Sequence, residues 1–207
     1  MIVLKTVLIG DGGVGKTAIR ERYLGKGFKA QYVLTIGADF ATKDDVINKT
    51  PVRYQIWDLA GQKRFDGVRG VFYKGALGAL LVYDVTRPDS YHNVPKWVKE
   101  LWKNNGWGKV PIILVGNKID LRKSNNNAIR QEEGEALTEK LTKMTSDMGF
   151  SCHYIETSAK TGINISDAFS LLGKNILQFV EKRKYIQQKT GRSVGSLANQ
   201  TIIEQEH

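Results

Sequence analysis

The chain has 207 residues, 41% of them hydrophobic, which is enough for one compact domain with its own core but not for a second full domain. Its formal net charge of +10 favours an anionic partner such as a nucleotide, lipid headgroups or a nucleic acid, without choosing among them. A single cysteine, Cys152, excludes a disulfide framework, and no apolar run approaches the roughly 20 residues that a transmembrane helix needs.

Short apolar runs rich in β-branched residues alternate with amphipathic stretches along the chain. The predicted elements, in chain order, are a strand at 2–9, a helix at about 16–24, a strand at 52–57 followed by irregular chain, a strand at 77–82, a helix at about 94–103, a strand at 112–115, a helix at about 131–148, a brief strand around Tyr154 and a last helix from about Ile165. This order predicts an α/β fold with a mostly parallel, doubly wound sheet. Ligands bind beyond the carboxyl ends of the strands in such sheets, so we expect the functional motifs in those loops.

The end of the folded domain is predicted from a change in composition. The last helix turns basic at residues 182–184, and beyond about Thr190 the sequence is small and polar, as is typical of flexible tails. We therefore predict one domain over residues 1–186 and a flexible tail over residues 187–207.

Residues 10–17 read GDGGVGKT, which matches the pattern G-x-x-x-x-G-K-[ST] between a predicted strand and a predicted helix. Glycines let the backbone wrap a phosphate chain with its amide groups pointing inward, and the helix N-terminus adds partial positive charge. Lys16 is then expected to bridge the β- and γ-phosphates, and the Thr17 hydroxyl to ligate Mg²⁺. A plain glycine turn is the alternative, which the strand-to-helix context disfavours.

Residues 54–62 read YQIWDLAGQ, a strand that ends in an acid and is followed by a glycine. We expect Asp58 to hold Mg²⁺ through water, Gly61 to offer its amide to the γ-phosphate, and Gln62 to orient the attacking water. Taken alone, D-x-x-G is also common in ordinary turns after strands. Its position downstream of the phosphate loop favours the catalytic interpretation.

Asn117, Lys118 and Asp120 form an N-K-x-D motif after the strand at 112–115. The Asp120 carboxylate can accept hydrogen bonds from both N1–H and the exocyclic amine of guanine, whereas adenine offers no such pair of donors. Residues 157–160 read TSAK and follow the last predicted strand. The backbone amide of Ala159 is expected to reach guanine O6. Either motif alone occurs in surface turns, but behind a phosphate loop they predict selection of guanine.

Residues 4–180 resemble the Ras superfamily of small GTPases, and the Rab branch most closely, in five motifs that occur in the family's order. The resemblance implies the P-loop NTPase (G-domain) fold, a six-stranded, mostly parallel sheet flanked by helices. It also implies a molecular switch that binds GTP or GDP with Mg²⁺, hydrolyses GTP and serves membrane traffic.

The first switch carries the clearest Rab-like signature, because residues 32–40 read YVLTIGADF and contain I-G-x-D-F. By the resemblance, Thr35 matches the threonine that ligates Mg²⁺ only when GTP is bound. Phe28 matches the aromatic residue that packs against the guanine ring.

Phe40, Trp57 and Phe72 match an aromatic triad that effectors of the family recognise. Burial in the core is the alternative for these three side chains, as for any large apolar residue. Leu59 and Lys63 depart from the threonine and glutamate that are common in Rab proteins, although neither change alters the phosphate chemistry.

The motifs and the resemblance together define three sets of site residues. The predicted nucleotide-binding residues are Gly12, Gly13, Val14, Gly15, Lys16, Thr17, Ala18, Phe28, Tyr32, Thr35, Gly61, Asn117, Lys118, Asp120, Ser158, Ala159 and Lys160. The predicted metal ligands are Thr17, Thr35 and Asp58, and the predicted catalytic residues are Gln62 and Lys16. The loop offers no evident arginine finger, so we expect one in trans and an unaided turnover on the order of 10⁻⁴ to 10⁻³ s⁻¹, by analogy with Ras.

The partners implied are GTP and GDP, a GTPase-activating protein, an exchange factor and effectors, with no nucleic acid and a monomeric chain. A GTP-binding scaffold with negligible turnover is the main alternative, although such a protein more often lacks Gln62 or Thr35. A translation or ribosome-assembly GTPase would normally carry an added RNA-binding domain, for which no residues remain. Asp120 disfavours an ATPase.

No cysteine follows Cys152, whereas Rab proteins usually finish with one or two prenylated cysteines. Firm anchoring by a covalent lipid is therefore not expected unless the chain was cut, and the predicted location is the cytoplasm, with peripheral contact to membranes at most. Basic residues in the range 182–192 can touch anionic lipid, each charge contributing about 1 kcal/mol near a surface. A solvated helix end is the alternative interpretation of this stretch.

Overall fold

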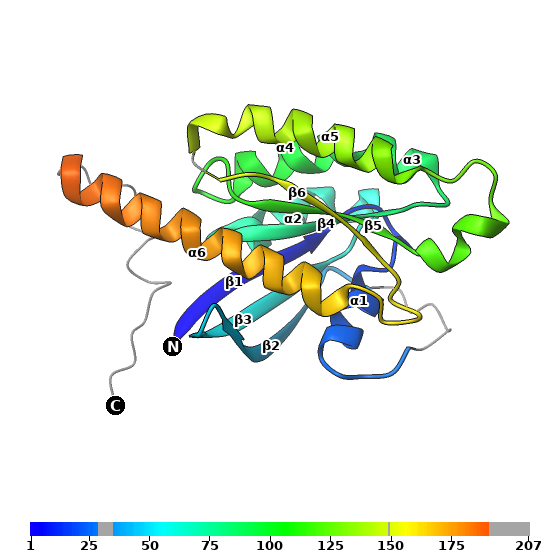
Figure 1. Cartoon of the computed structure of the whole chain (residues 1–207), viewed down its shortest axis with the longest axis horizontal. Coiled ribbons are helices and arrows are strands. Elements are labelled where there is room, and N and C mark those ends of the chain that lie inside the picture. The colour runs from blue at the N-terminus through cyan, green and yellow to red at the C-terminus, as the bar shows by residue number, and fades with distance from the viewer. Residues whose placement is uncertain (29–34, 149, 191–207) are drawn as a thin grey trace.

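The computed structural model describes residues 1–28, 35–148 and 150–190, which form a central sheet with helices on both faces (Figure 1). The strands are β1 (Ile2–Ile9), β2 (Ala38–Ile47), β3 (Thr50–Leu59), β4 (Gly78–Asp84), β5 (Ile112–Asn117) and β6 (His153–Thr157). They form one six-stranded sheet in the order β2-β3-β1-β4-β5-β6. Only β2 pairs with its neighbour in the antiparallel sense. The predicted α/β fold with a mostly parallel, six-stranded sheet is confirmed.

The helices occupy two layers. They are α1 (Lys16–Tyr23), α2 (Asp66–Tyr73), α3 (Pro88–His92), α4 (Val94–Asn104), α5 (Gln131–Met144) and α6 (Ile165–Thr190), with 3-10 turns at Lys63–Phe65, Ile119–Ser124 and Ser146–Met148. In Figure 1, α1 and α6 lie on one side of the sheet, and α4 and α5 lie on the other. The expectation of irregular chain after β3 is wrong for α2, and α5 ends at Met144 rather than near Met148, where a 3-10 turn takes over.

The antiparallel strand β2 is absent from the predicted elements, and its surroundings explain why. It is an edge strand paired only with β3, so most of its side chains remain exposed or half-buried. Its residues, ADFATKDDVI, carry charges in place of the continuous apolar run of a buried strand. The central strand β4 shows the opposite pattern, because all seven of its residues are buried.

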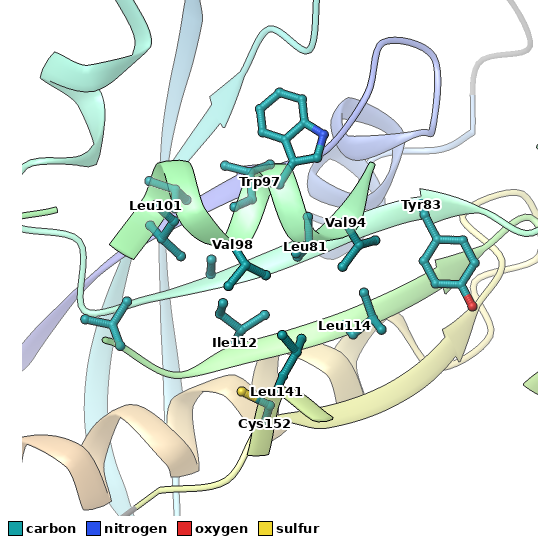
Figure 2. Packing of buried hydrophobic residues seen from close by; sticks show 14 of the residues in the cluster. Leu81, Tyr83, Val94, Trp97, Val98, Leu101, Ile112, Leu114, Leu141 and Cys152 are labelled. Atoms are coloured by element: carbon teal, nitrogen blue, oxygen red, sulfur yellow. The ribbon is translucent and has the colours of Figure 1, made fainter. Parts of the chain in front are cut away.

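Two clusters of buried side chains hold the layers together. One lies between the sheet and α2, α4 and α5, and the other lies between the sheet and α1 and α6. Figure 2 shows part of the first cluster, where Val98 and Leu101 of α4 approach Ile112 of β5. Burial on both faces keeps the strands rigid, so the loops at their carboxyl ends are held at defined positions.

Helix α6 continues to Thr190, so the predicted boundary between residues 186 and 187 falls inside it. Residues 191–207, which make up most of the predicted tail, lie outside the described residues. Within the described ranges, none of the helices combines the length and the apolar character that crossing a membrane requires.

Candidate nucleotide-binding site

The phosphate loop joins the end of β1 to the start of α1, and three of its glycines, Gly10, Gly13 and Gly15, have positive φ. Gly10 has φ 133°, and a Cβ atom there would lie 2.0 Å from the carbonyl oxygen of Val82. Gly15 caps α1 with φ 101°, and a Cβ atom there would lie 2.3 Å from Nδ2 of Asn117. Neither position has room for a side chain, so the backbone of the loop packs directly against β4 and the N-K-x-D motif.

Lys16 lies under this loop and is almost completely buried. Its Nζ atom donates to the carbonyl oxygen of Gly10 at 2.7 Å and to that of Asp11 at 2.8 Å. Burial lowers the pKa of Lys16 to about 8, partly offset by the charges of Asp58 and Asp11. A phosphate group bound in the loop would give this ammonium a charged acceptor and favour its protonated form.

The three predicted metal ligands lie together. Thr17 Oγ1 donates to Asp58 Oδ2 at 2.5 Å and lies 2.9 Å from Thr35 Oγ1. Asp58 is fully buried at the end of β3, and its Oδ1 atom has no hydrogen-bond partner among the described residues. Burial raises the pKa of Asp58, although Thr17 and Lys16 oppose this effect. Two hydroxyls and a carboxylate are the hard oxygen donors that Mg²⁺ prefers, and a cation would satisfy the orphaned oxygen, so these residues fit a magnesium site.

Gly61 and Gln62 lie against the phosphate loop. A Cβ atom on Gly61 would lie 2.4 Å from the carbonyl oxygen of Gly10, which leaves no space for a side chain. The Nε2 atom of Gln62 lies 3.5 Å from the point that a Cβ atom on Gly12 would occupy. The buried Oε1 atom of Gln62 has no hydrogen-bond partner in the described part of the chain. The side-chain amide therefore lies beside the phosphate loop with one polar atom available.

Asn117 connects the two predicted base-recognition motifs to the phosphate loop. Its Nδ2 atom donates to the carbonyl oxygen of Val14 at 2.8 Å, and its Oδ1 atom accepts from Thr157 Oγ1 at 3.0 Å. Oδ1 also accepts the amide of Ala159 at 3.2 Å, so in this structure that predicted guanine contact is bonded within the protein. Asn117 thereby joins three loops that are far apart in the sequence.

The two other polar residues of the N-K-x-D motif are also paired. The ammonium of Lys118 donates to the carbonyl oxygen of Gly13 at 2.8 Å and lies 2.7 Å from Asp84 Oδ2. Asp120 Oδ1 accepts from Ser158 Oγ at 2.6 Å, which fixes the carboxylate relative to the TSAK loop. The orientation of Asp120 therefore depends on the loop after β6.

Sequence reasoning missed an ion pair beneath these loops. Arg122 Nη1 donates to Glu156 Oε2 at 2.7 Å, and Nη2 of the same guanidinium pairs with Oε1. The hydroxyl of Tyr154 donates to that Oε1 atom at 2.8 Å. These hydrogen bonds to Glu156 raise the pKa of Arg122. The pair ties the loop after β5 to β6, and a charge pair 34 positions apart leaves no local sequence signal.

The remaining predicted nucleotide-binding residues lie at the edges of the site. Phe28 is 43% exposed, Lys160 is exposed, and Ala18 packs partly against the cluster under α1. Tyr32 lies outside the described residues.

The predicted aromatic triad forms a continuous surface. The ring centroids of Phe40 and Trp57 are 4.9 Å apart, and those of Trp57 and Phe72 are 5.6 Å apart. Phe40 is 46% exposed, whereas Trp57 and Phe72 are half-buried. The triad is therefore neither a fully buried core nor three isolated surface residues.

The sequence of the chain is similar to a known protein family and to several characterised proteins. The model of the Ras family matches residues 5–178. The chain is 36% identical over 200 residues to Ras-related protein RABA2a of Arabidopsis thaliana, which covers 97% of this chain and 87% of that protein. It is 37% identical over 187 residues to Ras-related protein Rab7 of Drosophila melanogaster, covering 89% and 85% respectively. It is 38% identical over 181 residues to GTP-binding protein ypt3 of Schizosaccharomyces pombe, covering 87% and 79%.

Proposed function

Because this chain belongs to the Ras family, whose members are GTP hydrolases, we propose that it binds GTP and GDP, hydrolyses GTP and acts as a Rab-like switch in membrane traffic. The observation that carries this proposal is the meeting of four motifs at the carboxyl ends of β1, β3, β5 and β6. The contacts of Asn117 with Val14 and Thr157 support it most directly, because they join the phosphate loop to both base-recognition loops. A relative named as GTP-binding is 38% identical over 181 residues.

The chemistry proposed needs little covalent assistance from the protein. Phosphoryl transfer is catalysed mainly by positioning and by neutralising charge. Lys16 would hold the β- and γ-phosphates, the amide of Gly61 would donate to the γ-phosphate, and Gln62 would orient the attacking water. Mg²⁺, which members of the family generally require, would be held by Thr17, Thr35 and Asp58 and would neutralise phosphate charge.

The switch proposed depends on the γ-phosphate. Thr35 and Gly61 belong to different loops, and both are expected to be held only while that phosphate is present. Its loss would release the two loops and change the surface around Phe40, where effectors would dock. A GTPase-activating protein and an exchange factor would set the lifetime of each state.

Nucleotide binding is tested first, with purified full-length chain and a fluorescent GDP displaced by unlabelled GTP, GDP or ATP. We expect GTP and GDP to compete and ATP to fail at a hundredfold higher concentration. Asp120→Asn should shift the preference from guanine toward xanthine, because an amide can donate to the xanthine carbonyl. Lys16→Ala should abolish binding, and unchanged affinity in that variant would refute the phosphate site.

Hydrolysis is tested by single-turnover phosphate release from bound GTP. The unaltered chain should turn over slowly, and Gln62→Leu should keep GTP bound while releasing phosphate more slowly. Equal rates for the two proteins would discard the role of Gln62. Tight GTP binding without any phosphate release would favour the alternative, a GTP-binding scaffold.

Partner and membrane binding need separate measurements. Affinity capture with a non-hydrolysable GTP analogue against GDP should recover effectors only with the analogue, and Phe40→Ala should lose them. The basic end of α6, with exposed Lys182, Lys184 and Lys189, would contact anionic membranes weakly. Co-sedimentation with vesicles containing phosphatidylserine, compared with phosphatidylcholine alone, tests that contact.

A further inference from the structure

The second residue of the phosphate loop, Asp11, is held by hydrogen bonds from outside the loop. Its Oδ1 atom accepts from the indole Nε1 of Trp97 at 2.8 Å, and its Oδ2 atom accepts from Nδ2 of Asn93 at 2.8 Å. Trp97 belongs to α4, and Asn93 immediately precedes that helix. The carboxylate is therefore bonded through both oxygens to one helix, which fixes the loop relative to α4.

The ring of Trp97 also faces the segment 61–73, which contains Gly61, Gln62 and α2 and which we call the second switch. The guanidinium carbon of Arg69, on α2, lies 4.5 Å from the centroid of this ring. Figure 2 shows the indole pointing away from Ile112 and Leu114, at the margin of the buried cluster. One side chain thus contacts the phosphate loop through its N–H and the second switch through its aromatic face.

Arg69 is fully buried, which is unusual for an arginine and requires that its charge be paired. Its Nε and Nη2 atoms donate to the two carboxylate oxygens of Glu100 at 2.8 and 3.1 Å. The hydroxyl of Tyr73 donates to the same carboxylate at 3.0 Å. This fork-to-fork pair fixes the plane of the guanidinium.

The remaining nitrogen of that guanidinium reaches the backbone around Gly61. Nη1 of Arg69 donates to the carbonyl oxygens of Ala60 and Gln62, each at 3.2 Å. These two carbonyls lie on either side of Gly61, which itself packs against the carbonyl of Gly10. The position of Arg69 therefore determines where the Gly61 amide and the backbone of Gln62 lie relative to the phosphate loop.

We propose that Arg69, oriented by Glu100 and stacked on Trp97, is a positioning residue for GTP hydrolysis, and that Trp97 and Asp11 complete its link to the phosphate loop. This inference rests on the proposed function, because it assigns Arg69 to holding Gln62 and Gly61 where that reaction needs them. Arg69 touches neither nucleotide nor water in this role. Displacing a reacting group by about 1 Å can lower a rate by about a hundredfold, so a loss of this link is expected to slow hydrolysis measurably.

Three variants and one control test the link. Arg69→Met removes the charge, and Arg69→Lys keeps it but cannot hold Glu100 and two carbonyls at once. Trp97→Phe keeps an aromatic face for Arg69 and loses the N–H that Asp11 accepts, together with part of the ring volume. Arg64→Met is the matched control, because Arg64 lies in the same switch but is exposed and stacks only on Phe65 among its described contacts.

Each protein is compared by single-turnover GTP hydrolysis and by GDP dissociation, after circular dichroism has confirmed the fold. We expect Arg69→Met and Arg69→Lys to hydrolyse GTP about tenfold to a hundredfold more slowly, with GDP dissociation changed less than about threefold. Trp97→Phe should slow hydrolysis about threefold to tenfold, with GDP dissociation again nearly unchanged. Arg64→Met should match the unaltered chain.

The inference is overturned if hydrolysis and GDP dissociation change by the same factor in the folded variants, or if hydrolysis does not change. Recovery of the full rate in Arg69→Lys would also overturn it, because charge without the forked geometry would then suffice. If Arg69→Met does not fold, Trp97→Phe decides the question without altering a charge. An unaltered chain that binds GTP but never releases phosphate would overturn the proposed hydrolysis and this inference together, whereas normal hydrolysis in every variant would overturn the inference alone.

Discussion

The hydroxyl of Thr17 donates a 2.5 Å hydrogen bond to Asp58 Oδ2, which joins the first turn of α1 to the end of β3. The other carboxylate oxygen of Asp58 has no partner among the described residues, although the side chain is fully buried. The Oγ1 atom of Thr35 lies 2.9 Å from the Thr17 hydroxyl. The oxygens expected to surround Mg²⁺ are therefore gathered from three segments of the chain.

From this arrangement we predict that chelating Mg²⁺ with EDTA speeds GDP dissociation about tenfold or more, because phosphate charge loses its counterion. Asp58→Asn should release GDP quickly even without EDTA, and adding EDTA should change its dissociation rate little. Fluorescent GDP dissociation measures both effects. Asp44→Asn, at an exposed carboxylate on β2, is the control and should behave like the unaltered chain. An undiminished EDTA response in Asp58→Asn would contradict the assignment.

A second prediction concerns the ion pair of Arg122 with Glu156, which ties together the two loops that would enclose guanine. Arg122→Ala should speed GDP dissociation about tenfold, equivalent to about 1.4 kcal/mol, because Asp120 loses its fixed position relative to Ser158. Arg130→Ala removes an exposed pair with Glu133 nearby and should change the rate little. Equal dissociation rates for Arg122→Ala and the unaltered chain would rule out a role for the pair in holding the base.

A third prediction concerns the packing of α6 on the sheet. A Cβ atom at Gly173 would lie 2.2 Å from the hydroxyl of Tyr54, which donates to the carbonyl oxygen of Phe169 at 2.7 Å. Gly173→Ala should therefore lower the free energy of unfolding by about 1–3 kcal/mol through overpacking. Gly67→Ala, on α2, meets no described atom within 4 Å and should be neutral or stabilising. Urea denaturation of both variants makes the comparison, and equal stabilities would show that the Tyr54 contact relaxes freely.

A fourth prediction concerns Cys152, the only cysteine in the chain. Burial raises the pKa of its thiol to about 11, so the protonated form is favoured in the folded state. The stability this contributes is present below the unfolded pKa and is lost as pH rises toward 11. At pH 8 a thiol reagent should modify the folded chain about a hundredfold more slowly than the urea-unfolded chain. Fast labelling under native conditions would contradict the burial, and Cys152→Ala should flatten the loss of stability at high pH.

The elements predicted from sequence agree with the structure wherever an apolar run is buried on both faces. Strands β4 and β5 and the second half of β1 are of this kind, and each strand begins and ends within two residues of its predicted bounds. Strand β2 and helix α2 are absent from the elements predicted from sequence, for different reasons. The strand is half-exposed and charged, and the helix contains two glycines and lies in a segment read as a loop.

By itself the sequence determined which segments to expect at the phosphate loop, the metal site and the base-recognition motifs, because each predicted motif lies in one short segment whose residue types and spacing are set by the backbone shape required. Only the tertiary structure decided how those segments are held. Asp11 meets Trp97 across 86 positions, and Nη1 of Arg69 meets the carbonyls beside Gly61. Such contacts depend on where helices pack on the sheet, and side chains that meet only through packing leave no periodicity or spacing in the sequence to reveal them.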